Sequence, residues 1–272
     1  MSQKKNSDTG FLASMNSIVE NASPEPSSST TFERPRMNSS EFDAVVHSRR
    51  SVRVFTGERI DSATMYKLFE LAHQSPSSSN IQPWEFHWIK ASEVRANLVK
   101  ACFSQPAART AGELVVIIAR KGTWRRNIQE IIRQLTSSSE KVPPGVLKYY
   151  KTLIPKALAL GPFYIAVPFK WLFTRVARYK QPTPQEPIGM SDLRVWAHKS
   201  TALAAQTFML ACRAHNLDSC PMEGFDSWRV KRLLKLPPDA EISMIVAVGK
   251  AKPEGLYGHR MRFDKAWHVF EV

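Results

Sequence analysis

The run Glu-Leu-Val-Val-Ile-Ile-Ala at residues 113–119 is short, apolar and rich in β-branched residues. A run of this length and composition predicts a buried strand. Residues 242–248 are likewise a short apolar run, rich in β-branched residues. Residues 84–89 alternate between apolar and polar side chains, as a half-buried strand does. The sequence therefore predicts three strands of a sheet.

Helical patterns lie between these strands. Asp61 is a candidate N-cap, and the apolar residues that follow it recur at helical spacing as far as Pro76, whose preceding residue is pushed out of the α region. Residues 91–102 and 227–236 also predict helices. The longest helix, capped by Ser191-Asp192, is expected to end near Ala214 and to be a central or dimer helix. No repeat and no Gly-x-Gly-x-x-Gly occurs, so the class is α/β or α+β without a dinucleotide-binding signature.

Bulk composition narrows the kind of protein further. With 272 residues, 43% hydrophobic and 23% charged, the chain is expected to form one globular domain with an ordered insertion. Its three cysteines (Cys102, Cys212 and Cys220) include no C-x-x-C pair, and its histidines show no metal-binding spacing. The sequence therefore predicts neither a disulfide framework nor a metal site.

The first 40 residues differ in composition from the rest. They are rich in Ser, Thr, Pro and Asn, which predicts a largely disordered arm ahead of a domain covering residues 41–272. Lys4 and Lys5 are followed by polar residues instead of the apolar run of a secretory signal, so we expect a cytoplasmic protein.

Three polar stretches are candidates for a binding site. Residues 48–55, Ser-Arg-Arg-Ser-Val-Arg-Val-Phe, can direct several guanidinium groups and a hydroxyl onto one anion, and arginine grips phosphate with two parallel hydrogen bonds. Residues 75–84, Ser-Pro-Ser-Ser-Ser-Asn-Ile-Gln-Pro-Trp, form a rigid polar loop that leads into a strand. The third stretch, Cys-Pro-Met-Glu-Gly-Phe, covers residues 220–225.

In this order and spacing the stretches resemble the nitroreductase family of flavin enzymes, over about residues 41–119 and 190–265. The matching residues are Arg49, Ser51, Arg53, Phe55, Pro76, Ser77, Ser78, Asn80, Gln82, Pro83, Trp84, Pro221, Glu223, Gly224, Phe225, and Arg260 or Arg262. The resemblance implies an α+β fold with a mixed, mainly antiparallel sheet flanked by helices. It also implies FMN as cofactor.

The resemblance assigns roles at one end of the flavin. Arg49 and Ser51 would hold the phosphate and ribityl end, Arg260 would be a second phosphate clamp, and Arg50 would contribute mainly its backbone. Arg53 would lie next to flavin N1 and O2, where a fixed cation stabilises the reduced ring and raises its potential.

Further roles concern the ring and the partner subunit. Pro76, Ser77, Ser78 and Asn80 resemble the segment that reaches the flavin of the neighbouring subunit, which implies a homodimer with composite sites. Pro221 and Glu223-Gly224 resemble the turn whose backbone N–H meets the N5/O4 edge. Where many relatives have Asn and then Lys or Gln, this chain has Ser104 and Gln105, and either residue can be the substitute.

The reaction implied is borne by the flavin, with no catalytic side chain. NAD(P)H reduces the flavin, leaves, and a flat small-molecule acceptor such as a nitroaromatic or quinone takes the electrons in the same space by a ping-pong mechanism. Two alternatives stay open. One is a specialised flavin enzyme of the same fold, either a substrate dehydrogenase or a flavin-consuming enzyme. The other is a non-catalytic flavin-binding or peripheral-membrane protein.

Residues 122–187 form an insertion in this framework. Its part from 122 to 180 has eleven Lys/Arg against two Glu, and its longest uncharged run, residues 157–169, is too short to span a membrane. We favour a helical lid that packs on the core. A basic, apolar surface that touches an anionic membrane ranks below it. Nucleic acid ranks last, because no nucleic-acid motif surrounds the aromatic residues.

Overall fold

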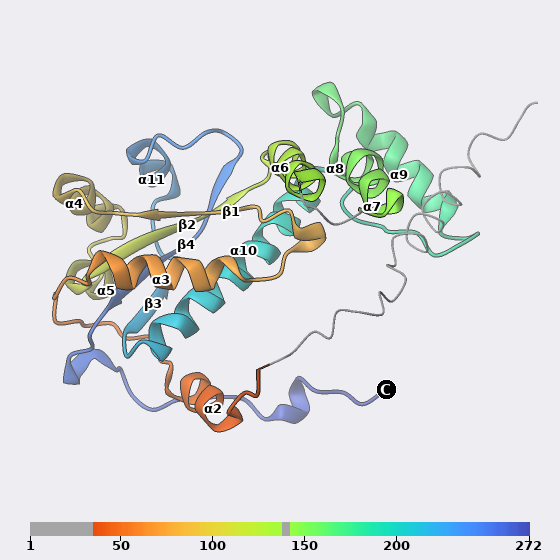
Figure 1. Cartoon of the computed structure of the whole chain (residues 1–272). Coiled ribbons are helices and arrows are strands. Elements are labelled where there is room, and N and C mark those ends of the chain that lie inside the picture. The colour runs from red at the N-terminus through yellow and green to blue at the C-terminus, as the bar shows by residue number, and fades with distance from the viewer. Residues whose placement is uncertain (1–34, 138–141) are drawn as a thin grey trace, which may run out of the picture.

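The computed structural model describes residues 35–137 and 142–272, and its centre is an antiparallel sheet in the order β1-β2-β4-β3 (Figure 1). The strands are β1 (Trp84–Trp88), β2 (Glu113–Arg120), β3 (Asp218–Met222) and β4 (Ala240–Gly249). The three predicted strands are confirmed. Strand β3 was not predicted, because Asp-Ser-Cys-Pro-Met has no β-branched or aromatic residue and includes Pro221; proline is tolerated there because β3 is an edge strand.

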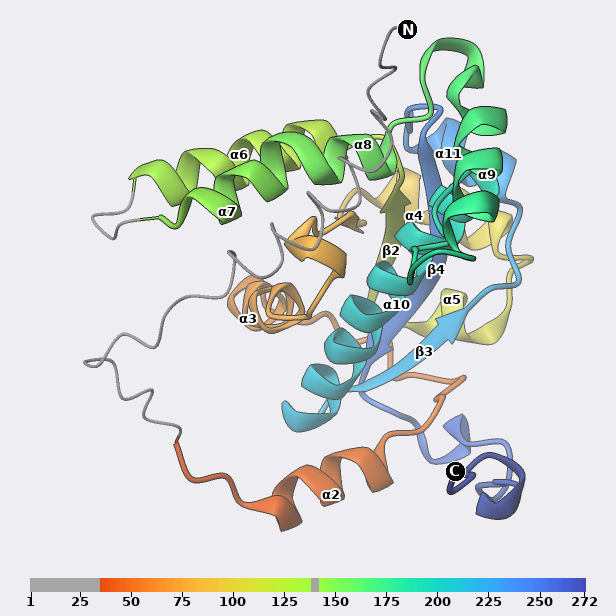
Figure 2. The same cartoon turned by 90° about the vertical axis from the view of Figure 1, so that its right-hand side faces the viewer.

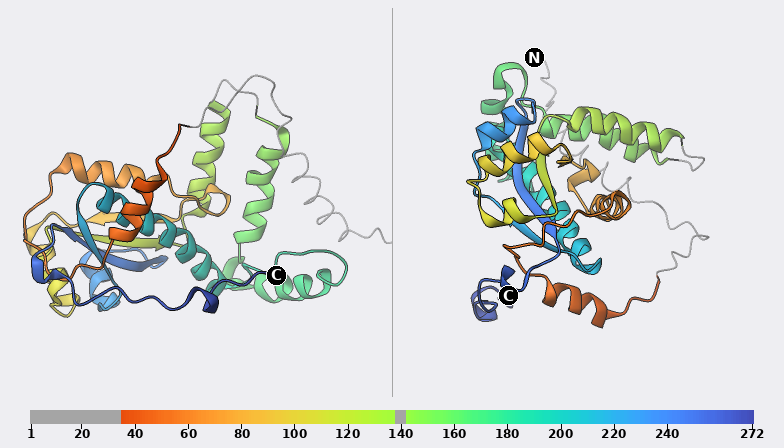
Figure 3. Two further views of the ribbon diagram at one scale, coloured as in Figure 1. Left: turned by 90° about the horizontal axis from the view of Figure 1, so that it is seen from below. Right: turned by 90° about the vertical axis from the view of Figure 1, so that its left-hand side faces the viewer.

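Two layers of helices cover the sheet, one on each face (Figure 3). The layers are α3 (Ser62–His73) with α10 (Met190–Ala214), and α4 (Ser92–Ala101), α5 (Pro106–Thr110) and α11 (Ser227–Leu233) opposite. Strand β2 shows why both faces are apolar: Val115 and Ile117 pack with α3 and α10, while Leu114, Val116 and Ile118 pack with the other layer. The expected α+β class with its largely antiparallel sheet is confirmed.

The ends of the helices follow local chemistry. Asp61 caps α3 by accepting a hydrogen bond from the Thr64 backbone N–H at 2.8 Å, as predicted. Helix α10 begins earlier than predicted: Gly189 is the N-cap, and Asp192, three residues in, accepts from the backbone N–H of Gly189 at 3.0 Å. Helix α11 ends at Leu233, short of the predicted 236, and Lys235 then adopts a positive φ of 51°.

Two peripheral segments lie together at one end of the molecule, away from the insertion (Figures 1 and 2). They are helix α2 (Ser39–Ser48) and the C-terminal segment with the 3₁₀ turn η5 (Lys265–Trp267). The arm predicted for residues 1–40 lies outside the described residues as far as residue 34. Helix α2 already begins at Ser39, where the Asn38 side chain accepts from the Ser40 backbone N–H at 3.1 Å.

The described part of the insertion is largely helical. It consists of α6 (Trp124–Ser137), α7 (Pro144–Lys148), the π-helical turn η2 (Tyr149–Leu153), α8 (Ile154–Leu158), the turn η3 (Pro162–Tyr164) and α9 (Ala166–Ala177). Trp124 and Ile128 of α6 pack with Leu158 and with Trp196 of α10 in a small core of their own. Within the described part of the chain, no helix is both long and apolar enough to cross a membrane.

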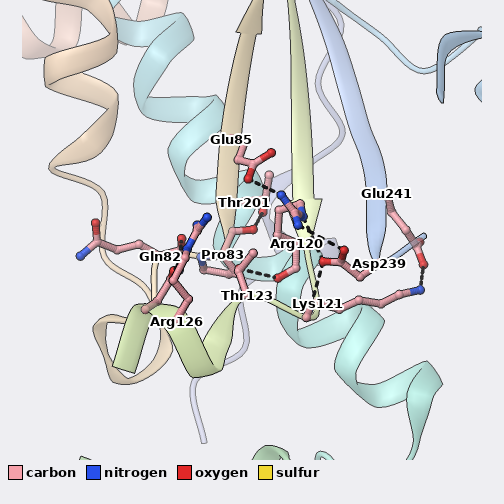
Figure 4. A network of polar contacts seen from close by, with 12 residues as sticks. Gln82, Pro83, Glu85, Arg120, Lys121, Thr123, Arg126, Thr201, Asp239 and Glu241 are labelled. Carbon is pink, nitrogen blue, oxygen red and sulfur yellow. Dashed lines mark hydrogen bonds and ion pairs between the residues drawn. The ribbon is translucent and has the colours of Figure 1, made fainter. Parts of the chain in front are cut away.

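Ion pairs fix the base of the insertion (Figure 4). Arg120, the last residue of β2, binds Glu85 and also Asp239, the latter through Nε at 3.0 Å. Lys121 binds Glu241, whose carboxylate also pairs with Arg194. These pairs hold the end of β2 against β4 and α10 at the point where the chain leaves the sheet.

Candidate cofactor site

Four arginines from two distant segments meet where α2 ends. Arg260 donates through Nη2 to the carbonyl oxygen of His47 at 2.8 Å and also to that of Arg49, and Arg50 donates to the Gly258 carbonyl at 2.7 Å. Carbonyls at a helix C-terminus carry a partial negative charge, so a cation such as Arg260 is stabilised there. Residues 49–50 are thereby tied to residues 258–262.

The electrostatics of this arginine cluster favour an anion. Burial lowers the pKa of the Arg49 guanidinium below its ordinary value, and the positive charges of Arg260, Arg262 and Arg50 lower it further. None of the four takes part in an ion pair with a carboxylate of the described residues. Arg260 and Arg262, between which the sequence left the choice open, both lie close enough to Arg49 to affect its pKa.

Backbone pairing places Ser51 and Arg53 beside the edge strand. Ser51 forms a parallel bridge with Ser219 of β3, and the Val52 backbone N–H donates to the Ser219 carbonyl at 3.1 Å. Cys220, next along β3, has its pKa raised by burial, while the charges of Arg53 and Arg49 act in the opposite direction. Both arginines therefore lie near Cys220, and its buried thiol is a packing group.

Arg53 is exposed and only weakly held by the protein. Its guanidinium lies over the Tyr257 ring, 5.3 Å from the centroid, and makes a long hydrogen bond of 3.5 Å to the Ser51 carbonyl. The backbone beneath it is fixed, since the Arg53 N–H donates to the Gly255 carbonyl at 2.8 Å and Val52 is buried. The side chain thus projects from a rigid support and is free to bind a ligand.

The turn after β3 is held by Gln105. Its side-chain amide donates to the Gly224 carbonyl at 2.9 Å and to the Cys102 carbonyl at 3.2 Å. Of the pair Ser104 and Gln105, Gln105 is therefore the residue that joins the turn. Gly224 does not have a positive φ, and a Cβ there would meet nothing within 4 Å, so its backbone is open to close approach. Pro221 pairs with Val246 within the sheet, and Glu223 is exposed.

The Pro76–Asn80 loop does not join these groups within one chain. It leads into β1, the sheet edge opposite β3, so three strand spacings of about 4.8 Å separate the two edges. The Ser78 backbone N–H lies 3.5 Å from Ser200 Oγ of α10, and Ser77 Oγ accepts from the Gln82 N–H at 3.0 Å. Pro76, Ser78 and Asn80 are exposed at this edge.

The insertion closes over that same loop. Tyr149 OH and Ser79 Oγ are 2.7 Å apart, and the Asn127 side chain donates to the Ile81 carbonyl at 2.8 Å. Between the loop and α6 lies a cavity of about 710 Å³, lined among others by Asn80, Trp84 and Arg126. The insertion therefore shapes a space beside the residues expected to reach a partner's cofactor.

Several contacts here were missed from sequence. Arg50 was assigned mainly a backbone role, but its side chain binds the Gly258 carbonyl. Gly255 allows the C-terminal segment to approach residues 52–54, because a Cβ at that position would lie 2.5 Å from the Val54 carbonyl oxygen. Gly255 and Gly258, shortly before Arg260, were the sequence signal that could have indicated this close approach. No sequence pattern indicated the buried hydroxyl of Ser219, which has no hydrogen-bond partner among the described residues.

The fold and these segments have counterparts among known proteins. The nitroreductase family model matches residues 46–250. Protein DrgA of Synechocystis is 31% identical over 210 residues, covering 77% of this chain and 83% of that protein. The 4-nitrobenzoate reductase of Pseudomonas putida is 28% identical over 220 residues, covering 78% and 86%. A solved protein of Exiguobacterium sibiricum, described as a nitroreductase in complex with FMN, has a TM-score of 0.58 at 21% identity and covers 88% of this chain and 99% of its own.

The family model covers about three-quarters of the chain, and it includes the segments of residues 49–53, 76–80 and 220–225. The chain belongs to the nitroreductase family.

Proposed function

We propose that this protein is an FMN-dependent oxidoreductase that takes electrons from NAD(P)H and passes them to a nitroaromatic, quinone or similar flat acceptor. The observation that carries the proposal is the cluster of Arg49, Arg50, Arg260 and Arg262, which forms no ion pair among the described residues and borders the same edge strand as the open turn at Gly224. The positive charges of the other three arginines act on Arg49, and an anion bound there would offset them; the terminal phosphate of FMN supplies one.

The residues fit the rest of the cofactor as well. Arg49, Arg260 and Arg262 would hold the phosphate, and Ser51 would meet the ribityl chain. The missing side chain at Gly224 leaves its backbone accessible to a flat ring, and Gln105 keeps that turn in place. Arg53, supported by Tyr257, has no carboxylate partner among the described residues and would supply a cation at the ring edge.

When bound, FMN would supply the redox chemistry, accepting a hydride from NAD(P)H and later giving electrons to the second substrate in the ping-pong order. The protein's own contribution is to bind and orient. A fixed cation such as Arg53 favours the negative charge that accompanies reduction. Because the flavin carries the reaction, no side chain need serve as nucleophile or general base.

The acceptor class rests on the cavity between α6 and the 76–80 loop, whose lining combines apolar and polar side chains. Such a mixture suits a flat molecule with polar substituents. The relative of this protein from Pseudomonas putida is named 4-nitrobenzoate reductase, so 4-nitrobenzoate is the first acceptor to test. We place the reaction in the cytoplasm, where NAD(P)H is available.

We also propose that the active unit is a homodimer. Pro76–Asn80 lies at the sheet edge opposite the arginine cluster, so in a composite site it would serve the cofactor of the partner. Mixed dimers test this. One subunit would carry Arg49→Glu and the other Asn80→Trp; a composite site predicts one intact site in the mixed dimer and roughly half of wild-type activity. Activity no higher than that of the parent variants would argue against shared sites.

The visible absorbance spectrum of the purified protein is the first experiment. Flavin bands equivalent to one FMN per chain, with FMN identified by chromatography after heat release, are expected. A colourless protein that also fails to take up FMN would overturn the proposal.

Steady-state NAD(P)H oxidation with 4-nitrobenzoate and a quinone follows. Parallel double-reciprocal lines are expected for the ping-pong order. Bound flavin without turnover of these acceptors would instead favour a specialised flavin enzyme of the same fold.

A further inference from the structure

Helix α9 carries an apolar stripe that nothing in the described part of the chain covers. Ile165 at its N-cap, followed by Phe169, Leu172 and Val176, recurs at intervals of four, three and four residues, which aligns these side chains on one side of a helix. All four are exposed, Phe169 by 70% and Leu172 by 57%. Isolated exposed apolar residues are ordinary, but an aligned set on one helix marks an interaction surface.

The other side of α9 is the one that holds it to the protein. Ala177 is buried, Val167 packs against the core of the insertion, and Lys170 Nζ donates to the Ala157 carbonyl at 2.7 Å. Figure 2 shows α9 apart from the pair formed by α6 and α7. The stripe thus faces away from the contacts that fix the helix.

The segment that contains the stripe is basic. Residues 142–185 contain seven Lys or Arg and not one Asp or Glu. Arg175 lies over the Trp171 ring at 5.5 Å, on one flank of the stripe, and Arg178 lies over the Tyr179 ring at 4.9 Å, just after the helix. An apolar stripe flanked by aromatic residues and cations is the pattern of a helix that lies in the plane of a membrane surface.

A second copy of this chain fits the surface less well. A twofold contact through α9 would bring Arg175 and Arg178 of each subunit close to those of the other, with no acidic residue between positions 142 and 185 to offset them. Anionic lipid headgroups provide the complementary charge, and the acyl region accepts the aliphatic and aromatic side chains. Charge complementarity therefore favours an anionic membrane over a second copy of this chain as the partner of the stripe.

We propose that α9 is a docking element by which this protein binds the surface of anionic membranes, with Ile165, Phe169, Leu172 and Val176 entering the headgroup–acyl boundary. The contact is peripheral and reversible, since one amphipathic helix with few cations gives modest affinity. It does not depend on the redox activity proposed above.

The test is co-sedimentation of the full-length protein with vesicles of phosphatidylcholine alone or with 30% phosphatidylglycerol. Binding is expected only to the anionic vesicles, and it should weaken on the order of fivefold for each cation removed in Arg175→Gln and Arg178→Gln. The double variant Phe169→Ser/Leu172→Ser should bind at least about tenfold more weakly. Equal binding to both vesicle types, or none to either, would overturn the proposal.

A matched pair of tryptophans separates docking from nonspecific attraction of a basic protein. Trp171 on α9 and Trp228 on α11 are exposed by 51% and 61%, and each lies beneath an arginine, Arg175 at 5.5 Å and Arg232 at 4.5 Å. Trp171→Ser should reduce vesicle binding, whereas Trp228→Ser should not. An equal effect of the two substitutions would mean that α9 is not the contact.

Two controls address the other occupants. If light scattering shows that Phe169→Ser/Leu172→Ser converts a larger oligomer into a smaller one without changing vesicle binding, a second copy covers the stripe and the proposal fails. If the full chain does not bind anionic vesicles but a chain lacking residues 1–34 does, residues 1–34 cover the stripe and the proposal also fails. Circular dichroism and melting temperature confirm that each variant is folded.

Discussion

The arginine cluster around Arg49 and the cations of residues 142–185 are two basic regions that differ in how the charge is held. In the cluster, Arg260 and Arg50 bind backbone carbonyls, and the charges are close enough to lower the pKa of Arg49. On α9 the cations border an exposed apolar stripe and lie over aromatic rings. Concentrated, half-buried charge suits one small anion, whereas dispersed charge beside apolar side chains suits an extended surface.

The largest effect is expected from reversing one charge in the cluster. Arg260→Glu should raise the FMN dissociation constant at least about 100-fold, because a charged hydrogen bond is replaced by repulsion. FMN fluorescence titration measures it. Arg178→Glu, the same change in the other basic region, should leave FMN affinity within about twofold.

Arg260→Gln guards against misreading a loss of structure. It removes the charged group that donates to the His47 and Arg49 carbonyls and leaves a polar, uncharged side chain in its place. We expect a nearly unchanged melting temperature with weakened FMN binding. Equal FMN affinities for Arg260→Glu and Arg178→Glu would remove the distinction between the two regions.

A substitution at Gly224 sharpens the comparison of the two basic regions, because it tests whether the edge of the molecule beside the arginine cluster is shaped for a ligand. A Cβ at Gly224 meets no atom of the described residues within 4 Å, so Gly224→Val should leave the melting temperature within about 2 °C and weaken FMN binding about tenfold. At Gly112 a Cβ would lie 2.1 Å from the Glu58 carbonyl oxygen, and Gly112→Ala should lower the melting temperature clearly. Similar losses of stability in both variants would contradict this view.

Arg53 should have a smaller effect, on the chemistry more than on binding. Arg53→Ala is expected to lower the two-electron potential of bound FMN by about 30 mV, equivalent to the loss of about 1.4 kcal/mol of preference for the reduced form. Arg53→Lys should restore part of the shift, since it keeps the charge. Arg232→Ala, which removes another arginine from an aromatic ring, is the control; spectroelectrochemistry showing the same potential in all four proteins would place Arg53 outside the site.

The smallest effect concerns the ion pairs at the base of the insertion. Burial acts to raise the pKa of Glu241, but hydrogen bonds from Lys121, Arg194 and His198 outweigh it and hold the value to about 2, below the ordinary 4.5. A carboxyl whose pKa is lowered by folding stabilises the folded state at any pH above its ordinary pKa of 4.5, and this stabilisation is lost as the pH falls toward about 2. Glu241→Gln should therefore lower the melting temperature at pH 7, by an amount that shrinks below about pH 4.5.

Glu70→Gln is the matched control for that titration. Glu70 pairs with Lys67 on the exposed side of α3, and such surface pairs contribute little. Its melting temperature should follow the wild type from pH 7 to pH 3. A difference between Glu241→Gln and wild type that grows on acidification would mean that the pair is not what stabilises the insertion.

Local patterns predicted much of the fold. β-branched runs located β2 and β4, and Asp61 with Pro76 bracketed α3, because these signals act through the backbone of neighbouring residues. Strand β3 was missed because Asp-Ser-Cys-Pro-Met has no strand-like composition, and only pairing with β4 makes it a strand. The start of α10 was misplaced because Asp192 caps the helix from its third position.

The candidate site shows the same division. Sequence motifs named Arg49, Arg53, Gly224 and the 76–80 loop, but the choice between Arg260 and Arg262, and between Ser104 and Gln105, depended on distances across the molecule. The structure places both C-terminal arginines near Arg49 and gives Gln105 the contact with the turn. Nothing in the chain order indicated that Arg50 would bind the Gly258 carbonyl.

By itself the sequence determined the family motifs, the continuous apolar run that buries both faces of β2, and the excess of positive charge in the insertion. Only the tertiary structure decided that one basic segment gathers around Arg49 while another leaves Phe169 and Leu172 exposed on α9. The physical reason is range. Propensity and periodicity act over a few residues, whereas burial and charge clustering arise between segments about 200 residues apart, such as Arg49 and Arg260.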